Sequence, residues 1–555
     1  MRINALLFPF LIFGMTMVYG QHDVPTLPEY YVDVTVKDHT EIQKLSIDYS
    51  IDRILPSEDN EGFQVRLWIP NQLFPKFDSL QLPYSIVLEN NKFVEITDSY
   101  FHLLTYWDSY PTYSAYLQTL SYFAEAHGDI CSIDTILKNT LRGRMIPVLR
   151  IHNNNGERKP SVFLSSAIHG DEVTGYYLML RLANFILSQR DNPKVQQIIE
   201  HIDLWICPLE NPDGTYYSGD HTLGASPIST RGNAHQVDLN RNFPKIFGME
   251  GETYEPETEA FMEFFEKHRF TLSAAIHGGA ELVNYPWDSY KSFLMEHPDR
   301  DWWVMVGTRF VTNCQNIYPQ HMSTVPSGVV AGGDWYVVFG SRQDYVTHYQ
   351  YGREFTIEIS ESKVLPSESM HTLWGITKEA FLDFILEGDR GITGQVYDSV
   401  SLQMVNATIF IENHDESLQN SFVLTNDAGQ YFRLIAPGTY EVTCTASPYK
   451  PMTKTVTVAE NETTILDFDL APLSVTEYKN SICQVYPTFA DQTVTVELTV
   501  LPATCQLFTI DGTLISTHPL HDTKTTLHIA DLAAGTYLAV IKNEQFRKVF
   551  KIVNR

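Results

Sequence analysis

The stretch from Ser161 to Ile186 constrains the fold more than any other part of the chain. It opens with an apolar run, 161–168, that has the length and branching of a buried strand and ends abruptly in His169-Gly-Asp-Glu172. A helical pattern follows, in which apolar residues over 178–186 supply a broad apolar face. Open α/β sheets place their chemistry just outside the carboxyl ends of their strands. The stretch therefore predicts an α/β domain with site residues on the turn at 169–172.

A metal site is the hypothesis that this turn suggests. A neutral imidazole and a carboxylate three residues apart, His169 and Glu172, can bind one metal ion. Catalytic zinc sites typically use two His and one Glu and leave a fourth position to water. The pair alone is weak evidence, because so short a motif also occurs by chance. A third ligand is available downstream, where a second strand-like run, 272–276, ends in His277-Gly-Gly.

Further polar motifs follow in a fixed order along the chain. They are Asn211-Pro-Asp-Gly214, Arg231, Val237-Asp-Leu-Asn-Arg-Asn-Phe243, Gly333-Asp-Trp-Tyr336 and Phe355-Thr-Ile-Glu-Ile-Ser360. With the two His motifs, this set resembles the zinc metallocarboxypeptidases, and closely their regulatory branch, the carboxypeptidase N, E and D type. The resemblance covers roughly residues 105–388. It implies an α/β fold with a mixed, eight-stranded type of sheet covered by helices.

The resemblance implies one Zn²⁺ in the catalytic domain, with His169, Glu172 and His277 as its ligands. Asp238 matches the carboxylate that orients a ligand histidine from behind. Glu358 matches the general base, which would take a proton from zinc-activated water and pass it to the leaving amine.

Glu354, on the same strand as Glu358, is the competing candidate for the base. An inward carboxylate on an apolar strand is costly unless it has a role. The spacing from Tyr336 matches the family and favours Glu358.

Recognition of the substrate follows from the same resemblance. Asn240 and Arg241 match the pair that grips the free C-terminal carboxylate, for which a planar guanidinium is suited. Tyr336 matches the tyrosine that closes over the substrate. Arg231 matches the residue that polarises the scissile carbonyl and stabilises the developing oxyanion.

Specificity is expected to depend on Asp288 and its companion Gln343, which match the pocket residues of the regulatory branch. A buried carboxylate there would accept C-terminal Arg or Lys and repel acidic ends. Arg342 departs from the family pattern, because relatives often have a small or apolar residue there. Its positive charge beside the pocket would weaken the binding of basic ends.

The regions that flank the catalytic unit are predicted from pattern and composition. Residues 1–20 have the charged start, apolar centre and small-residue end of a signal peptide, and no later stretch is long and apolar enough to span a membrane. Residues 21–104 are expected to form strands and short helices, either as a prosegment-like cleft cap or folding aid, or as an ordinary accessory domain. The net charge of −28 argues against nucleic acid as a partner.

The C-terminal part of the chain is predicted to form two small β-sandwiches after the catalytic domain at 105–388. Short strands separated by turn residues over 389–472 resemble the transthyretin-like domain of regulatory carboxypeptidases. Residues 481–555 resemble the C-terminal sorting domains of type IX secretion cargo, which implies the outer-membrane secretion machinery as a partner. A carbohydrate- or protein-binding sandwich is the alternative. Cys483 and Cys505 share this region and are a candidate disulfide.

The sequence therefore predicts a secreted or surface-attached zinc carboxypeptidase whose substrates are peptide and protein C-termini, with release of Arg or Lys. Two alternatives stay open. One is the same hydrolysis with another specificity, including an amide bond in cell-wall peptide. The other is an inactive, surface-displayed peptide-binding protein, against which the intact set of metal ligands, Glu358 and both arginines argues.

Overall fold

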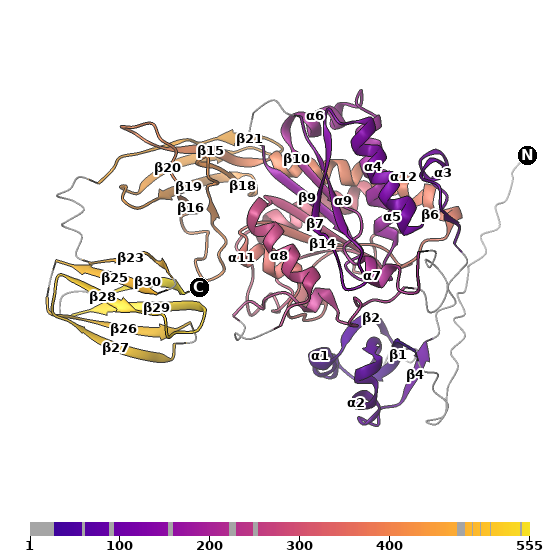
Figure 1. The fold of residues 1–555 in the computed structure, drawn as a ribbon, viewed down its shortest axis with the longest axis horizontal. Helices are drawn as coiled ribbons and strands as arrows, with labels where there is room; N and C mark the ends of the chain where they lie inside the picture. The colour runs from indigo at the N-terminus through magenta and orange to yellow at the C-terminus, as the bar shows by residue number, and fades with distance from the viewer. Residues whose placement is uncertain are drawn as a thin grey trace, which may run out of the picture.

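The computed structural model describes residues 27–57, 62–87, 94–153, 159–220, 229–247, 253–473 and 483–554, apart from 491, 500, 511 and 544–546. Figure 1 shows a helix-covered sheet, with a small N-terminal module on one side and two strand-rich modules at one end. The predicted signal peptide, 1–20, lies outside the described residues. No helix in the described part of the chain is long and apolar enough to cross a membrane.

The central sheet has eight strands in the order β13-β12-β14-β11-β9-β10-β8-β7. Its four middle strands, β14, β11, β9 and β10, run parallel, and antiparallel pairs extend it on both sides. The strands are β7 (Cys131–Leu137), β8 (Ile146–Ile151), β9 (Ser161–Ser166), β10 (Asp203–Cys207), β11 (Leu272–His277), β12 (Ala280–Tyr285), β13 (Val329–Ala331) and β14 (Arg353–Ser360). The mixed, helix-covered sheet that the sequence predicts is confirmed.

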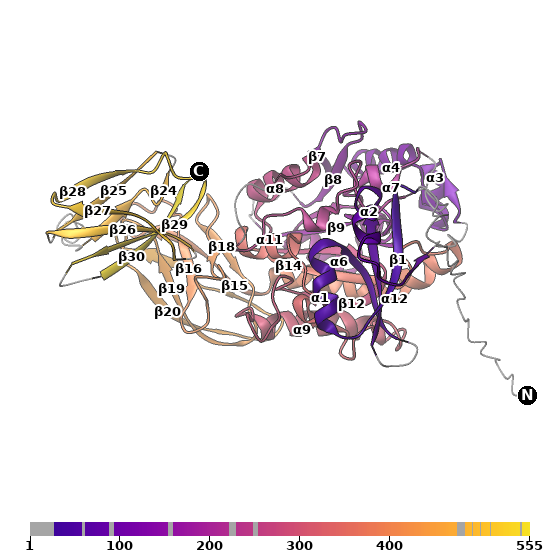
Figure 2. The same ribbon diagram turned by 90° about the horizontal axis from the view of Figure 1, so that it is seen from below.

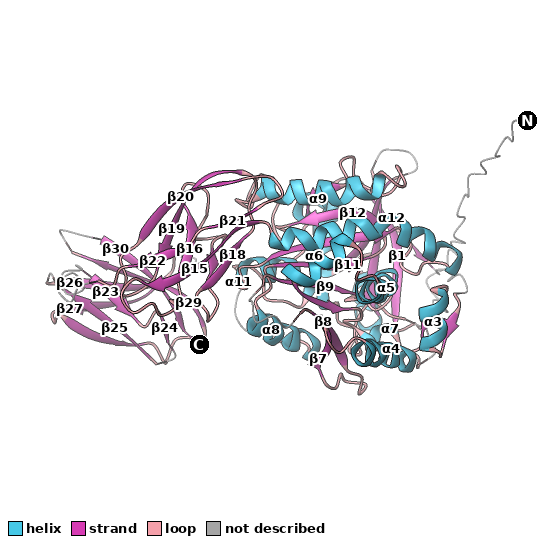
Figure 3. Cartoon of the chain, turned by 90° about the horizontal axis from the view of Figure 1, so that it is seen from above, coloured by secondary structure: helices cyan, strands magenta, loops and turns pink. Residues whose placement is uncertain are grey.

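Helices cover both faces of this sheet because its strands are apolar on both sides. On β9, Val162 and Leu164 join one apolar cluster while Phe163, between them, joins another. The first cluster includes the helices α4 (Tyr113–Ala126), α5 (Thr174–Ser188), α6 (Pro193–His201), α9 (Arg300–Gln315) and α12 (Ser367–Leu386). The second includes α8 (Pro256–His268) and α11 (Arg342–Tyr349). Figure 3 shows α5, α6, α9 and α12 lying together over one face.

Short elements make the loops at the edges of this domain. They are β5 (Ile96–Thr97), α3 (Tyr100–Tyr106), β6 (Tyr110–Pro111), α7 (Pro212–Thr215), η2 (Leu239–Arg241), α10 (Gly332–Trp335) and η3 (Glu387–Asp389).

The N-terminal module is an antiparallel sheet of four strands in the order β2-β3-β1-β4, with its own apolar core. Its elements are β1 (Glu29–Val36), α1 (His39–Asp48), β2 (Ser50–Pro56), β3 (Phe63–Pro70), η1 (Asn71–Leu73), α2 (Phe74–Asp78) and β4 (Tyr84–Val87). In Figure 1 it lies below the catalytic domain, with β2 toward it, and Figure 2 shows it crossing the front of that domain. The edge strand β2 therefore faces the rest of the molecule.

Two strand-rich modules follow, each with two sheets around a separate apolar core. The first contains β15 (Gly391–Asp398), β16 (Thr408–Ile411), β17 (Val423–Leu424), β18 (Gln430–Arg433), β19 (Gly438–Thr445), β20 (Met452–Val458), β21 (Thr463–Ile465) and β22 (Phe468–Leu470). The second contains β23 (Cys483–Tyr486), β24 (Phe489–Ala490), β25 (Thr493–Leu498), β26 (Ala503–Thr509), β27 (Leu514–Leu520), β28 (Lys524–His528), β29 (Gly535–Lys542) and β30 (Arg547–Asn554).

The cysteines do not link these elements. All six lie in the described part of the chain, and each is buried with a free thiol. The candidate disulfide between Cys483 and Cys505 is not formed in this structure. Both side chains instead pack in the core of the last module, where they act as small apolar groups.

A buried arginine joins the first strand-rich module to the catalytic domain. Arg433, at the end of β18, donates to both carboxylate oxygens of Asp299, at 2.7 and 2.9 Å, and to Asp415 at 2.6 Å. Asp299 directly precedes α9 and also accepts from Arg353 of β14 at 2.8 Å. The next residue, Leu434, packs into the core of the catalytic domain. The joint therefore buries two cations, Arg433 and Arg353, with two carboxylates, Asp299 and Asp415. Each buried charge is stable only while its partners of opposite sign are present.

We expect the substitution Arg433→Ala to lower the free energy of unfolding by about 3–5 kcal/mol, because it leaves buried carboxylates without their cation. Urea unfolding followed by tryptophan fluorescence measures the change. Lys454→Ala removes a half-exposed cation from β20 of the same module and should cost less than about 1 kcal/mol. An unfolding curve for Arg433→Ala that overlays the wild type would contradict this account of the joint.

Candidate active site

Three predicted metal ligands meet at the carboxyl edge of two neighbouring parallel strands. Ile276 of β11 lies opposite Ser166 of β9, so His277 ends its strand beside the turn that carries His169 and Glu172. His169 Nδ1 lies 2.9 Å from Glu172 Oε1, and His277 Nδ1 lies 3.0 Å from Glu172 Oε2. All three side chains are buried, and one possible ligand atom from each lies within 4.8 Å of the others.

The protonation of His169 fits a bound cation. Its Nε2 lies 3.0 Å from Asp238 Oδ1. Burial alone would raise the pKa of Asp238, but Arg231 and His169 beside it hold that pKa well below its usual range, so the carboxylate is an acceptor. Nε2 is then a donor, and Nδ1 also faces a carboxylate, that of Glu172. Burial and Arg231 alone would lower the pKa of His169, but Glu172 and Asp238 raise it, so positive charge is favoured between Nδ1 and Glu172. A metal ion bound there would supply that charge in place of the proton, and two His with one Glu are ligands typical of catalytic zinc.

Arg231 lies beside this trio and is held by two carboxylates. Its Nε donates to Asp238 at 3.0 Å and its Nη1 to Glu172 at 3.1 Å. Asp238 begins the short helix η2 and also accepts from the backbone N–H of Asn240. The loop that carries Asn240 and Arg241 is thus tied to the same carboxylate that orients His169.

Glu358 lies on β14 directly opposite His277 of β11. Its carboxylate lines the same cleft as the trio, and its Oε2 has no hydrogen-bond partner among the described residues. Burial, and then the nearby charge of Glu172, raise its pKa well above the usual range of a glutamate. A buried carboxyl with a free oxygen and a raised pKa is suited to proton transfer.

Glu354, the competing candidate, is engaged elsewhere. Its carboxylate accepts from Ser273 Oγ at 2.8 Å and from Arg342 Nε at 2.8 Å. It lies four residues before Glu358 on an extended strand, which is roughly 13 Å along the chain. Glu354 therefore belongs to a network inside the domain, and the cleft is lined by Glu358.

The remaining predicted site residues also surround the cleft. Asn240, Arg241, Tyr336 and Asp288 line it together with the trio. Gln343 is adjacent, and its Nε2 donates to Asp288 Oδ1 at 3.0 Å and to Asn284 Oδ1 at 2.9 Å. Burial raises the pKa of Asp288 to about 6. Asp288 therefore places a buried carboxyl in the wall of the cleft, held in position by Gln343.

Two residues of this pocket were not predicted from the sequence. Asp344 accepts from the backbone N–H groups of Asp288 and Ser289 at 2.8 and 2.9 Å, and so holds the loop that carries Asp288. Gly332 leaves the space that Asp288 occupies, because a Cβ there would lie 1.8 Å from Asp288 Oδ1. Two signals in the sequence could have indicated these residues. Asp344 directly follows Gln343, and the pair Gly332-Gly333 precedes the Tyr336 motif.

The charge of Arg342 is directed away from the pocket, contrary to the concern that the sequence raised. Its guanidinium is fully buried, and Nη1 lies 2.7 Å from Glu210 while Nε lies 2.8 Å from Glu354. It also packs over the ring of Phe163, 5.6 Å from the centroid. Two carboxylates compensate this cation inside the domain, so it does not oppose Asp288.

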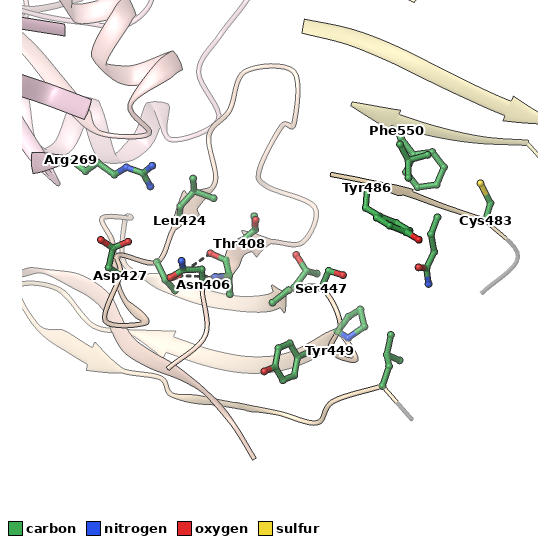
Figure 4. Close-up of a pocket in the computed structure, with 18 residues that line it drawn as sticks. Arg269, Asn406, Thr408, Leu424, Asp427, Ser447, Tyr449, Cys483, Tyr486 and Phe550 are labelled. Carbon is green, nitrogen blue, oxygen red and sulfur yellow. Dashed lines mark hydrogen bonds between the residues drawn. The ribbon is translucent and has the colours of Figure 1, made fainter. Parts of the chain in front are cut away.

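The N-terminal module contributes to the wall of the cleft. Ile51 and Asp52 of β2 line it beside the trio. A larger hollow of about 850 Å³ lies between the two strand-rich modules, with Tyr486 and Phe550 on one side and Thr408 and Tyr449 on the other (Figure 4). None of the predicted site residues lines that hollow.

Comparison with known proteins gives matches over three parts of the chain. Residues 116–380 match the zinc carboxypeptidase family, 391–471 the carboxypeptidase regulatory-like domain, and 484–555 the secretion system C-terminal sorting domain. The sorting domain marks the protein as secreted or attached to the cell surface.

Individual relatives agree with these matches. The catalytic chain of carboxypeptidase N from Homo sapiens is 32% identical over 403 residues, which cover 63% of this chain and 81% of that relative. Carboxypeptidase D from Homo sapiens is 29% identical over 368 residues, and these cover 26% of its length. Among solved structures, carboxypeptidase A from Helicoverpa armigera matches with a TM-score of 0.48 and 17% identity, over 65% of this chain and 97% of that one. The extent of the match to carboxypeptidase N shows that this chain is an enzyme and belongs to the zinc carboxypeptidase family.

Proposed function

We propose that this enzyme removes C-terminal Arg or Lys from peptides and proteins outside the cell. One observation carries the proposal: a buried cleft brings together three possible metal ligands, a carboxyl with a free oxygen at Glu358, and the pocket carboxylate Asp288. The reaction has three requirements, and each group meets one of them. The ligands hold the metal, Glu358 accepts a proton, and Asp288 pairs with a basic side chain.

His169, Glu172 and His277 would hold the zinc ion, and Asp238 would keep His169 in the tautomer that binds it. A zinc ion bound there supplies a Lewis acid that makes water a nucleophile near neutral pH. Glu358 takes a proton from the attacking water and delivers it to the leaving amine. Its free Oε2 and its raised pKa support this assignment.

The substrate is held by other residues that line the cleft. Arg241 and Asn240 bind the C-terminal carboxylate, and Tyr336, which directly follows α10, covers it. Arg231, 3.1 Å from Glu172, is near enough to the metal trio to polarise the scissile carbonyl. Asp288, oriented by Gln343, pairs with the terminal guanidinium or ammonium of the substrate.

The other modules serve export and assembly. Separate apolar cores, two of them in the catalytic domain, support units at about 21–104, 105–388, 389–472 and 481–555, after a signal peptide at 1–20. The last unit is recognised by the type IX secretion machinery, in keeping with its match to a sorting domain.

Zinc binding tests the metal assignment. We expect His277→Ala to weaken zinc binding by more than about 100-fold, because it removes one of three ligands. Metal content after dialysis, measured by plasma emission spectrometry, should fall from one zinc per chain to a small fraction. His235→Ala, which changes an exposed histidine, is the control and should keep the full content. Equal zinc in both variants would rule out His277 as a ligand.

The role of Glu358 is tested by Glu358→Gln, which keeps the shape of the side chain and removes its basicity. We expect zinc to be retained and kcat to fall by about 10²–10⁴-fold. Hydrolysis of blocked dipeptides ending in Arg, before and after limited proteolysis, gives the rate. Glu361→Gln, three residues further along, should leave kcat unchanged. Full activity of Glu358→Gln would refute the assignment.

The specificity assignment predicts a dependence on pH. Asp288 can pair with a cation only when it is ionised, so kcat/KM for an Arg-ending peptide should fall as the pH drops through about 6. The ratio of kcat/KM for Arg-ending over Phe-ending peptides isolates this effect from the chemistry.

Substitution of the same residue gives a second test. Asp288→Asn should lower the ratio of kcat/KM for Arg-ending over Phe-ending peptides by about 10- to 100-fold at pH 7.5, because a charged hydrogen bond is lost. The variant should also lose the change of this ratio with pH near 6. Asp301→Asn, at an exposed position, is the matched control. A ratio unaltered by Asp288→Asn would mean that another group selects the substrate.

A further inference from the structure

The first strand-rich module contacts the segments of the catalytic domain that form the proposed specificity pocket. The contacts come from the loop 412–422, which connects β16 to β17. Three consecutive residues of this loop, Gln419, Asn420 and Ser421, each form a hydrogen bond with the catalytic domain, and we name them the 419–421 segment. In Figures 2 and 3, the helix α11, which carries Gln343, lies on the side of the catalytic domain that faces this module.

Gln419 holds the residue that directly precedes Asp288. Trp287 Nε1 donates to Gln419 Oε1 at 2.8 Å. The side chain of Trp287 is only 1% exposed, so Gln419 supplies the acceptor that the indole N–H needs inside the protein. The backbone oxygen of Trp287 accepts from the N–H of Gly333 at 2.7 Å. Trp287 therefore ties the start of the Asp288 loop to the module on one side and to α10 on the other.

Asn420 holds the helix that carries Gln343. Its Nδ2 donates to the carbonyl oxygen of His348 at 2.9 Å, near the C-terminal end of α11. The last carbonyl groups of a helix have no partner within it, so this bond caps α11. The other end of α11 carries Gln343 and Asp344, which hold the carboxyl group and the backbone of Asp288. Asn420 thus acts on both of the residues that fix Asp288.

Ser421 contacts the start of the strand that carries Glu358. Its carbonyl oxygen accepts from Arg353 Nη2 at 2.6 Å, and Arg353 is the first residue of β14. The 419–421 segment thus reaches three separate parts of the catalytic domain. Two of these parts carry the pocket residues Asp288 and Gln343.

The loop holds these three groups in fixed positions through its own hydrogen bonds. Ser421 Oγ accepts from the backbone N–H of Glu416 at 2.8 Å, and the backbone N–H of Gln419 donates to the carbonyl oxygen of Glu416 at 3.1 Å. Asp415, directly before Glu416, accepts from the buried Arg433 at 2.6 Å. The segment is therefore ordered by its own module, and a contact made by ordered groups loses little conformational entropy.

A joint that only held the two domains together would not need these partners. The ion pair between Arg433 and Asp299, with Leu434 in the apolar core, already joins the domains. The 419–421 segment instead contacts Trp287 and His348, whose rings lie 6.1 Å apart. The two contacts therefore act on one packed unit that includes the pocket residues.

From these contacts we propose that the first strand-rich module sets the specificity of the enzyme. Gln419 and Asn420 are positioning residues, because they hold Trp287 and α11 so that Asp288 and Gln343 keep the geometry in which a basic side chain pairs with the carboxylate. This inference deepens the proposed function and rests on it, since it concerns the same pocket. A displacement of about 1 Å in such a site can cost about 100-fold in rate.

The substitution Gln419→Leu tests the contact to Trp287, because it keeps the bulk of the side chain and removes the acceptor. We expect the ratio of kcat/KM for Arg-ending over Phe-ending peptides to fall by about 10-fold, through a higher KM for the Arg-ending peptide and an unchanged kcat. Gln419→Glu keeps an oxygen that accepts from the indole N–H and should restore the ratio. Gln403→Leu, at an exposed position of the same module, is the matched control.

The substitution Asn420→Asp tests the contact to α11. It replaces the donor Nδ2 with an oxygen that faces the carbonyl oxygen of His348, so two acceptors repel each other. We expect the same ratio of kcat/KM to fall by about 10-fold. Asn461→Asp is the control and should leave the ratio unchanged. Asn461 is exposed in the same module and has a similar left-handed backbone, φ 61° against 53° for Asn420.

Zinc content and the midpoint of urea unfolding, measured for every variant, separate positioning from a general loss of structure. A loss of structure lowers zinc content and the rate for both peptides alike, whereas a positioning role keeps the zinc and changes the ratio. Retained zinc with a lower ratio in Gln419→Leu and Asn420→Asp, and a restored ratio in Gln419→Glu, would support the proposal.

The outcomes also separate this inference from the proposed function. A wild type that prefers Arg-ending peptides, with ratios unchanged in Gln419→Leu and Asn420→Asp, would keep the proposed function and overturn the positioning role. A wild type without that preference would refute the proposed specificity. A ratio that still shifts in both variants would then support the positioning role, and unchanged ratios would refute both.

Discussion

The buried carboxylate of Glu172 is the interaction on which the rest of the site depends. It lies within hydrogen-bond distance of His169, His277 and Arg231, and the backbone N–H of Gly278 also donates to it. A buried charge is tolerated only when it is paired and hydrogen-bonded. The parallel strands β9 and β11 meet this demand because both end at the same edge of the sheet. Glu358, on the next strand, takes its raised pKa partly from the same charge.

Much of this arrangement could be predicted from the sequence because it depends on local pattern. An apolar run that stops at a polar turn places that turn at the end of a strand, and two such runs place His169 and His277 together. The direction of Arg342 could not be read in this way. Whether its side chain turns to the pocket or to Glu210 is decided by residues more than a hundred positions away in the chain. The same holds for Asp344, whose partners lie 55 and 56 residues before it.

Buried ion networks recur wherever separate parts of the chain meet. Arg433 joins a strand-rich module to Asp299 of the catalytic domain, and Lys363 connects Asp52 of the N-terminal module to Asp171. The two joints differ in what surrounds them. Leu434 anchors the first in the main apolar core, whereas Asp52 of the second lines the cleft beside the metal trio. The first joint therefore adds apolar burial to its ion pairs.

The bulge in β2, where Asp52 is an extra residue without a partner in β3, has a consequence for how the N-terminal module and the catalytic domain are coupled. Loss of Asp52 alone would restore an unbroken pairing between β2 and β3, with Ile51 and Arg53 still opposite their present partners. Neither the apolar core of the module nor any ligand of the metal would change. The bulge can thus be removed without altering the fold of the module or the metal site, so Asp52 is a position at which the contact between the module and the cleft can change independently of both.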